Sequence, residues 1–275
     1  MNGTFYSVAV PVGNTEDITL RAINVLKSVD VIACEDTRTS AFLLDKYKIR
    51  TKLLDCHKFN EAERSEKIVK MLENGLSVAL ISDAGTPGIC DPGSIVVKNV
   101  LNAGLKAVPI PGASALTAFL SVVPRDSEIF AFVGFLPKTP AKREEIFKCF
   151  STVNTVFYDS PNRLPATLED IIASRGADTK ITVARELTKI YEEFVTDSAR
   201  NVLNYYKEHV LKGEIVAMIH ADTPPENPDE IEFSQKIEKL EKAGFSAKDT
   251  AKILSTLFDF PKNKIYALTQ KRKNT

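Results

Sequence analysis

The 275-residue sequence contains no tryptophan, three histidines and four cysteines. Zinc sites built from Cys and His use closely spaced ligand pairs, and no Cys-x-x-Cys pair occurs here. We therefore expect no bound metal. We expect buried free thiols at Cys34, Cys56, Cys90 and Cys149.

Long apolar runs and a net charge are also missing. No stretch reaches 18 apolar residues, and the start, MNGTFYSVAVPVGN, lacks the basic flank and apolar core of a signal peptide. We therefore expect a cytoplasmic protein.

Lys plus Arg and Asp plus Glu number 36 each, so overall charge does not indicate nucleic-acid binding. Its distribution is more informative: residues 246–275 hold seven Lys or Arg against two Asp, as a phosphate-facing tail or a solvated end would.

Three common site motifs are absent. The first predicted strand is followed by PVGN and not by G-x-G-x-x-G, which disfavours a nicotinamide-binding Rossmann domain. Neither G-x-x-x-x-G-K-[ST] nor G-x-S-x-G occurs, which argues against a P-loop hydrolase and a nucleophile-elbow hydrolase. By elimination, we expect an organic cofactor held largely by backbone groups.

The most informative segment present is ISDAGTPGICDPG, residues 81–93. It follows an apolar run that predicts a buried strand, and it places three Gly, two Pro and two Asp before the next helix. Glycine allows a ligand to approach the main chain, and proline stiffens the path. A loop of this kind at the end of a buried strand is where open α/β sheets bind ligands.

Strand and helix patterns alternate along the chain, which predicts an α/β fold of two α/β domains. In the first half we expect strands at 5–12, 29–34, 77–81 and 106–110, a short one near Leu53, and a helix from Asp17. In the second half we expect strands at 129–135, 155–158, 181–184, 190–196 and 215–220, in a sheet that could be mixed. Polar, Pro-containing breaks place the domains at 1–123 and 124–222, with a helical extension at 229–275. Ser246 and Asp249 fit a capping box within that extension.

Loops with charged or small residues follow most of these strands: 11–14, 35–38, 83–93, 111–114, 159–163 and 185–189. Parallel strands place their carboxyl ends on one edge of a sheet, so several of these loops should gather at one rim. Each loop alone has a structural explanation. Together, they predict a site at that rim.

The chain contains, in order, VAVPVGNTEDITLRA, ACEDTR, SDAGTPGICDPG, PIPGASALTA, FVGFLP, FYDSPNRL, VARELTKIYEEF and GEIVAMI. In these segments it resembles the bacterial 16S ribosomal RNA cytidine 2′-O-ribose methyltransferases of the tetrapyrrole (corrin/porphyrin) methylase superfamily. The resemblance departs at Gly88, Cys90, Asp159 and Asn162, and CHKFNE around His57 is a loose match.

That resemblance implies S-adenosylmethionine as cofactor, a cofactor cleft between the two α/β domains, a homodimer, and 16S ribosomal RNA in the small subunit as partner. Carried onto matching positions, it implies cofactor contacts at Pro11, Asp83, Gly85, Thr86, Ser114, Ala115, Tyr158, Ala184 and Ile215.

Methyl transfer to a ribose hydroxyl needs an aligned acceptor and benefits from a base that removes its proton. We expect the base or orienting groups among Glu35, Asp36, Arg38, Glu186 and Lys189. Arg38 and Lys189 are also candidates for phosphate binding, and Arg38 has no obvious local partner. The competing explanation for residues 35–38 is a local ion-pair and helix-capping cluster. Asn60 and Glu61 are expected only to cap the helix that they open.

Two other functions remain open. The first is methylation of a tetrapyrrole or a protein side chain by the same fold, which would not need the basic tail. The second is a nucleic-acid-binding regulator whose α/β part senses a nucleotide. The neutral overall charge and the charged loops after the strands argue against this second function.

Overall fold

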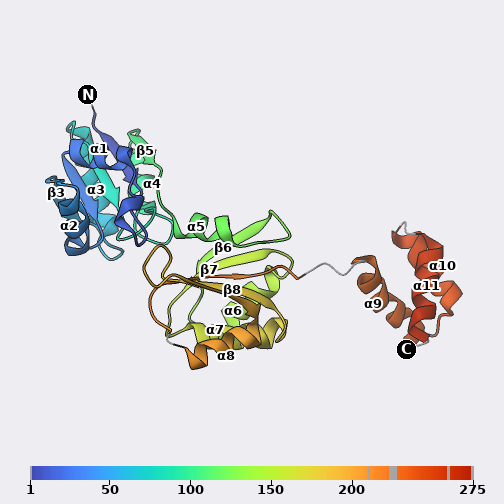
Figure 1. The fold of residues 1–275 in the computed structure, drawn as a ribbon. Coiled ribbons are helices and arrows are strands. Elements are labelled where there is room, and N and C mark those ends of the chain that lie inside the picture. Colours follow the sequence, from blue (N-terminus) through green and yellow to red (C-terminus); the bar gives the residue numbers. More distant parts are fainter. Residues whose placement is uncertain (1, 210, 223–227, 259–260, 274–275) are drawn as a thin grey trace. The chain divides into compact units, whose positions relative to one another are not determined.

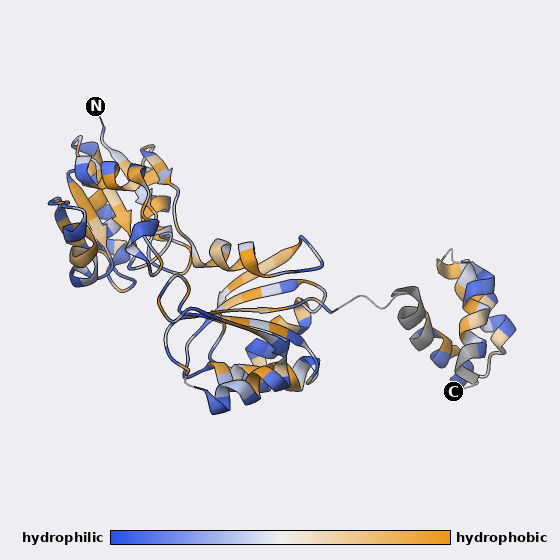
Figure 2. Cartoon of the chain, viewed as in Figure 1, coloured by the Kyte–Doolittle hydropathy of each residue, from blue (hydrophilic) through white to orange (hydrophobic). Residues whose placement is uncertain are grey.

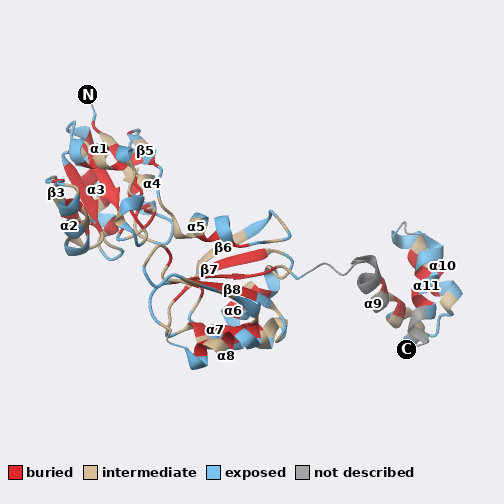
Figure 3. Ribbon diagram, viewed as in Figure 1, coloured by how far each residue is buried: buried red, intermediate tan, exposed pale blue. Residues whose placement is uncertain are grey.

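In the computed structural model, residues 2–209, 211–222, 228–258 and 261–273 are described. The chain forms two compact units, Met1–Ala221 and Asp222–Thr275 (Figure 1). Within the described ranges, no helix has both the length and the apolar character of a membrane span. Strands Val31–Cys34, Val78–Ile81 and Ile215–Ile219 of the first unit are hydrophobic and fully buried (Figures 2 and 3).

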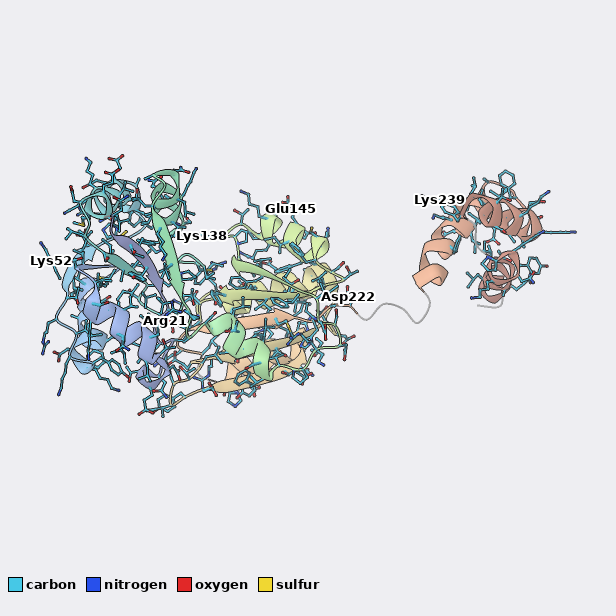
Figure 4. The ribbon with its side chains drawn as sticks, turned by 90° about the horizontal axis from the view of Figure 1, so that it is seen from above. Arg21, Lys52, Lys138, Glu145, Asp222 and Lys239 are labelled. Carbon is cyan, nitrogen blue, oxygen red and sulfur yellow. The ribbon has the colours of Figure 1, made fainter. Side chains whose placement is uncertain are left out.

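The first sheet of unit Met1–Ala221 is entirely parallel, in the order β3-β2-β4-β1-β5. Its strands are β1 (Thr4–Val8), β2 (Val31–Cys34), β3 (Lys52–Asp55), β4 (Val78–Ile81) and β5 (Lys106–Ile110). Lys52 on the edge strand β3 is exposed at the outer side of this sheet (Figure 4). Because all five strands run the same way, the loops after β1, β2, β4 and β5 meet at one edge, as the sequence predicts.

Helices cover both faces of this sheet because alternate strand residues point to opposite sides. On β2, Val31 and Ala33 join one core cluster, whereas Ile32 and Cys34 join another. The first cluster includes residues of α3 (Glu61–Glu73) and α4 (Ser94–Asn102), and the second includes residues of α1 (Leu20–Ser28) and α2 (Thr37–Lys46). The continuous apolar runs of these strands therefore encode burial on two sides.

Two expected boundaries near the N-terminus are wrong. The first strand was expected to reach Val12 but ends at Val8, and Val10 instead forms an isolated bridge with Gly85. The helix expected from Asp17 begins at Leu20, because the Thr19 side chain accepts a hydrogen bond from the Ala22 N–H and caps α1 there. The bridge to Gly85 draws the first strand's loop onto the loop after β4.

The second sheet is mixed, in the order β6-β7-β10-β8-β9, with only β6 and β7 parallel. Its strands are β6 (Phe130–Phe135), β7 (Asn154–Asp159), β8 (Lys180–Arg185), β9 (Glu193–Ser198) and β10 (Ile215–Ile219). Helices α6 (Pro140–Cys149), α7 (Leu164–Arg175) and α8 (Ala199–Glu208) lie on one face, and α5 (Ala115–Val122) lies on the other (Figure 1). Although α5 precedes the expected domain boundary at Val123, it packs on this second sheet; the boundary itself stays a prediction.

The strand expected at 190–196 begins only at Glu193, because residues 186–192 form consecutive turns. The Lys189 N–H donates to the Glu186 carbonyl at 3.0 Å, and the Glu192 N–H donates to the Lys189 carbonyl at 3.1 Å. Glu186 and Thr188 have φ angles of 54° and 65°, a region that non-glycine residues seldom occupy. A constrained loop therefore replaces the first part of the expected strand.

Unit Asp222–Thr275 consists, in its described residues, of three helices, α9 (Pro228–Lys242), α10 (Ala247–Phe258) and α11 (Lys262–Lys273). They share a small core of Phe233, Ile237, Ala251, Leu254, Ile265 and Leu268. The Asp249 N–H donates to Ser246 Oγ at 3.2 Å, which is the N-cap half of the expected capping box. Lys239 lies on α9 (Figure 4).

All four cysteines are free thiols, but the expectation that all are buried is wrong. Cys34 and Cys56 are buried in the first sheet's core, whereas Cys90 and Cys149 are exposed. Burial raises the pKa of Cys56 to about 12, so that thiol stays protonated and unreactive at neutral pH. Cys90 lies in the loop after β4, where the chain leaves the core.

Candidate active site

A cavity of about 400 Å³ opens in unit Met1–Ala221 where the loops of the first sheet meet the second sheet. The first sheet contributes residues from the loops after β1, β2, β4 and β5. The second contributes Phe135, Tyr158, Leu187 and Ile215, among others. The rim predicted from the strand-end loops is therefore one wall of this cavity.

Seven of the nine expected cofactor contacts line the cavity: Asp83, Gly85, Thr86, Ser114, Ala115, Tyr158 and Ile215. The other two lie behind the wall. Pro11 offers its carbonyl to the Gly85 N–H at 3.4 Å. Ala184 is fully buried in β8 opposite Val216, which itself lines the cavity.

The loop after β4 is held from two sides. Val10 and Gly85 exchange backbone hydrogen bonds of 2.8 and 3.1 Å, and Thr86 Oγ1 donates to the Ala113 carbonyl at 3.1 Å. Gly85 needs its φ of 72° to make this turn, a conformation that favours glycine. The loop therefore presents a fixed backbone to a ligand.

The end of the same loop is fixed by a side chain from another helix. Buried Glu61 Oε1 accepts hydrogen bonds from the N–H groups of Gly93 at 2.8 Å, Ile95 at 2.9 Å and Val96 at 3.4 Å. These N–H groups lie at the start of α4 and have no partner within the helix. Glu61 thus caps α4, so the expectation that it caps only the helix that it opens is wrong. Asn60 makes no side-chain cap on α3, and its Oδ1 accepts a hydrogen bond from the His57 N–H.

Glu35, Asp83 and Asp91 gather on one side of the cavity. Burial raises the pKa of each carboxyl, and the neighbouring negative charges raise it further. For Glu35 those neighbours are Asp91 and Asp83, while nearby His57 acts in the opposite direction on its pKa. Glu35 is therefore a carboxylate with an increased affinity for a proton.

The lining is strongly one-sided in charge. Asp159 and Glu214 line the cavity together with the three clustered carboxylates, and no Lys, Arg or His is among the described residues that line it. Such a cavity attracts a cationic ligand and repels an anionic one. Phosphate groups are thus poor occupants of its interior.

Asp36 and Arg38 interact with each other and do not line the cavity. Asp36 Oδ1 accepts from the Arg38 backbone N–H at 2.8 Å and caps α2, and Asp36 Oδ2 accepts from the guanidinium at 2.8 Å. The hydrogen bonds from Arg38 lower the pKa of Asp36 to about 2. The expectation that Arg38 lacks a local partner is wrong, although its side chain remains 89% exposed.

Glu186 and Lys189 form a three-membered ion cluster with Glu214. Lys189 Nζ lies 2.9 Å from both Glu186 Oε1 and Glu214 Oε2. Burial lowers the pKa of Lys189, but the two carboxylates outweigh burial and raise it. Neither Glu186 nor Lys189 lines the cavity, whereas Leu187 and Glu214 do. The cluster therefore positions part of the wall.

Sequence reasoning missed Phe135 and Glu214, which line the cavity but lie outside the expected loops, and it did not single out Cys90 and Leu187 within those loops. Glu214 is the second residue of the GEIVAMI segment, and its position just before a buried strand is the signal that could have identified it. Its neighbour Gly213 has a φ of 90°, and a Cβ there would collide with the Glu186 side chain. No periodicity reveals such a contact between distant segments.

Comparison with known proteins gives a consistent picture. The family model Tetrapyrrole (Corrin/Porphyrin) Methylases matches residues 4–203. A protein of Halalkalibacterium halodurans named Ribosomal RNA small subunit methyltransferase I is 36% identical, covering 96% of this chain and 93% of that protein. A protein of the same name from Haemophilus influenzae is 38% identical, covering 97% and 96%.

Solved structures show the same fold at low identity. Uroporphyrin-III C-methyltransferase from Thermus thermophilus, complexed with S-adenyl homocysteine, matches with a TM-score of 0.59 at 18% identity, covering 78% of this chain and 97% of that one. A diphthine synthase matches with a TM-score of 0.61 at 15% identity, covering 80% and 91%.

Proposed function

Because the chain belongs to the tetrapyrrole (corrin/porphyrin) methylase family and is an S-adenosylmethionine-dependent methyltransferase, we propose that it methylates ribosomal RNA of the small subunit. The proposed acceptor is the 2′-hydroxyl of a cytidine ribose in the decoding region of 16S ribosomal RNA. The observation that carries the proposal is the near full-length similarity to two relatives that bear the name of a ribosomal RNA methyltransferase.

The cavity fits S-adenosylmethionine in size and charge. Its volume of about 400 Å³ lies in the range of small-molecule sites. The clustered carboxylates Glu35, Asp83 and Asp91 complement the cofactor's sulfonium and ammonium groups. We propose that the fixed backbone of the loop after β4 and the nearby Asp83 and Thr86 hold its polar end.

When bound, this cofactor supplies a methyl group attached to a positively charged sulfur. The acceptor oxygen attacks that methyl carbon in line with the sulfur, which leaves. The chain's task is to orient the ribose hydroxyl and to accept its proton. Glu35 suits the second role, because it lines the cavity and its raised pKa strengthens it as a base. The other four candidates do not line the cavity and would act on the proton transfer only indirectly: Asp36, Arg38, Glu186 and Lys189.

The decisive experiment maps the transferred methyl group. Small subunits from a strain that lacks this protein are incubated with the purified chain and methyl-labelled cofactor. Label on a cytidine ribose of the decoding region is the expected result. Label that never enters RNA would refute the proposal and favour a tetrapyrrole or a protein side chain as acceptor.

The roles of the two expected phosphate contacts are tested separately. We expect Arg38→Ala and Lys189→Ala to reduce turnover on small subunits while each variant still binds the cofactor. The exposed Arg38 guanidinium should affect RNA binding, and Lys189 should act through the loop it holds. Near-normal turnover in both variants would exclude these assignments.

We also propose that the protein is a homodimer and that it acts in the cytoplasm beside the ribosome. We further propose that its basic tail contacts RNA. The dimer is tested by light scattering of the full chain. For the tail, we compare the full chain with a variant ending at Ala221, the last residue of the first compact unit. Equal RNA affinity across a salt titration would remove the tail from the RNA interface.

A further inference from the structure

Phe59 is 95% exposed, the largest exposed fraction among the exposed large hydrophobic residues described. It lies in the turn between β3 and α3. That turn is braced: the His57 N–H donates to Asn60 Oδ1 at 2.8 Å, and Asn60 Nδ2 donates to Asp55 Oδ2 at 2.7 Å. A well-held turn therefore presents an aromatic ring to solvent at little cost in conformational entropy.

The turn lies beside the cavity. Strand β3 pairs with β2, whose next residue, Glu35, lines the cavity. The His57 ring contacts Phe59 edge-on, with ring centroids 6.2 Å apart, and His57 also lies close enough to Glu35 to act on its charge. His57 therefore lies between the exposed Phe59 ring and Glu35, the proposed base on the cavity wall.

Charge divides this region into two zones. The cavity side holds Glu35, Asp83 and Asp91, which repel phosphates. Exposed cations lie outside it, Lys58 in the same turn as Phe59 and Arg38 at the start of α2. A nucleotide that reaches the cavity would turn its ribose inward and leave the phosphodiester chain near these cations.

We propose that Phe59 is a stacking platform for a base of single-stranded RNA next to the reacting nucleotide, with Lys58 and Arg38 contacting the adjacent phosphates. This inference rests on the proposed function. An aromatic ring flanked by cations is the arrangement by which proteins hold unpaired bases. A second copy of the chain would instead favour a contiguous apolar patch, whereas Lys58, His57 and Asn60 surround Phe59 with polar groups.

The test measures RNA affinity of the full-length chain by fluorescence anisotropy. The probes are a labelled cytidine oligoribonucleotide of about ten nucleotides and an abasic oligomer of equal length. We expect Phe59→Ala to weaken binding of the cytidine oligomer about tenfold, with an unchanged salt slope, and to leave the abasic oligomer unaffected. Phe59→Tyr keeps a ring and should bind like the parent chain.

Leu101→Ala is the matched control, because Leu101 is a 56% exposed apolar residue near the carboxyl end of α4 that does not line the cavity. It should leave RNA affinity unchanged. Light scattering and cofactor calorimetry accompany each variant. The inference is overturned if Phe59→Ala and the parent bind the cytidine oligomer with equal affinity. It is also overturned if Phe59→Ala loses as much affinity for the abasic oligomer, or if its loss of affinity coincides with a change of oligomeric mass.

The same samples separate this inference from the proposed function. If the parent chain labels small-subunit RNA while Phe59→Ala binds the cytidine oligomer normally, the platform is refuted and the function stands. If the parent chain neither binds the oligomer nor labels RNA, both are refuted.

Discussion

Gly13 packs so closely on Lys189 that a Cβ at position 13 would lie 2.5 Å from Lys189 Cγ. That Cβ would also lie 2.8 Å from Thr188 Oγ1, which already accepts a hydrogen bond from the Asn14 N–H at 3.0 Å. The loop after β1 is thus fitted to the loop after β8, which belongs to the other sheet. Val12 and Leu187, next to this contact, both line the cavity.

We expect Gly13→Ala to lower the affinity for S-adenosylmethionine about tenfold or more, because the added methyl group must push the two loops apart. The contacted atoms include the Leu187 carbonyl oxygen at 2.9 Å, which belongs to the backbone and cannot swing away. Isothermal titration calorimetry measures the change.

Gly104→Ala is the control for this substitution. A Cβ at Gly104 meets no atom within 4 Å, so the cost comes only from its φ of 69°, about 1 kcal/mol. We expect reduced stability with normal cofactor affinity. Unchanged affinity in Gly13→Ala would show that the loop contact does not shape the site.

Glu61→Ala should destabilise the chain by about 2–4 kcal/mol, since it removes a buried acceptor from three N–H groups at the start of α4. Glu61→Gln keeps one acceptor oxygen but loses the charge, and should cost less. Urea unfolding of both variants measures this. Similar stability of Glu61→Ala and the parent chain would contradict the capping role.

Glu35→Gln should lower kcat by about 100-fold if Glu35 accepts the hydroxyl proton. Burial raises the pKa of Glu35, so the acid limb of the parent's pH–rate profile should lie at a higher pH than the usual pKa of a glutamate. Activity should fall as pH drops through that raised pKa. The Glu35→Gln variant should lose this limb.

Asp91→Asn tests in which direction the acid limb of the pH–rate profile moves. Removing the Asp91 charge should lower the pKa of Glu35, because that charge is among the causes that raise it. The acid limb should therefore move to lower pH. A limb that moves upward, or that persists in Glu35→Gln, would assign the base to another group.

His220 should make stability depend on pH. Burial first, and then the charge of Lys180, lower the pKa of His220 to about 4. As pH falls from about 6.5, the unfolded chain binds a proton that the folded chain does not, so stability is lost until about pH 4. The loss should reach about 2 kcal/mol at pH 5.

Urea unfolding at pH 7 and pH 5 measures that loss in the parent chain and in His220→Gln. The imidazole Nε2 lies 2.9 Å from Thr182 Oγ1, and glutamine retains polar atoms for this contact. The variant should show a smaller pH dependence than the parent. Identical pH dependence in both would exclude His220 as its source.

Local patterns predicted the elements well where neighbouring residues decide them. The apolar runs at 29–34 and 77–81 became β2 and β4, buried on both faces. Boundaries failed where a side chain or turn intervened, as with the Thr19 cap and the turns before Glu193. Arg38 was misjudged because a side chain's partner depends on its rotamer, which the sequence does not show.

The sequence by itself determined the alternation of strands and helices, the Gly/Pro loop after β4 and the motifs that identify the family, because each is written in consecutive residues. Tertiary structure decided which carboxylates share the cavity. Asp83 and Glu214 are far apart in the chain, and only the meeting of two sheets brings both to one wall. It also assigned Glu61 to a helix other than its own, because buried N–H groups take whichever acceptor the fold places beside them.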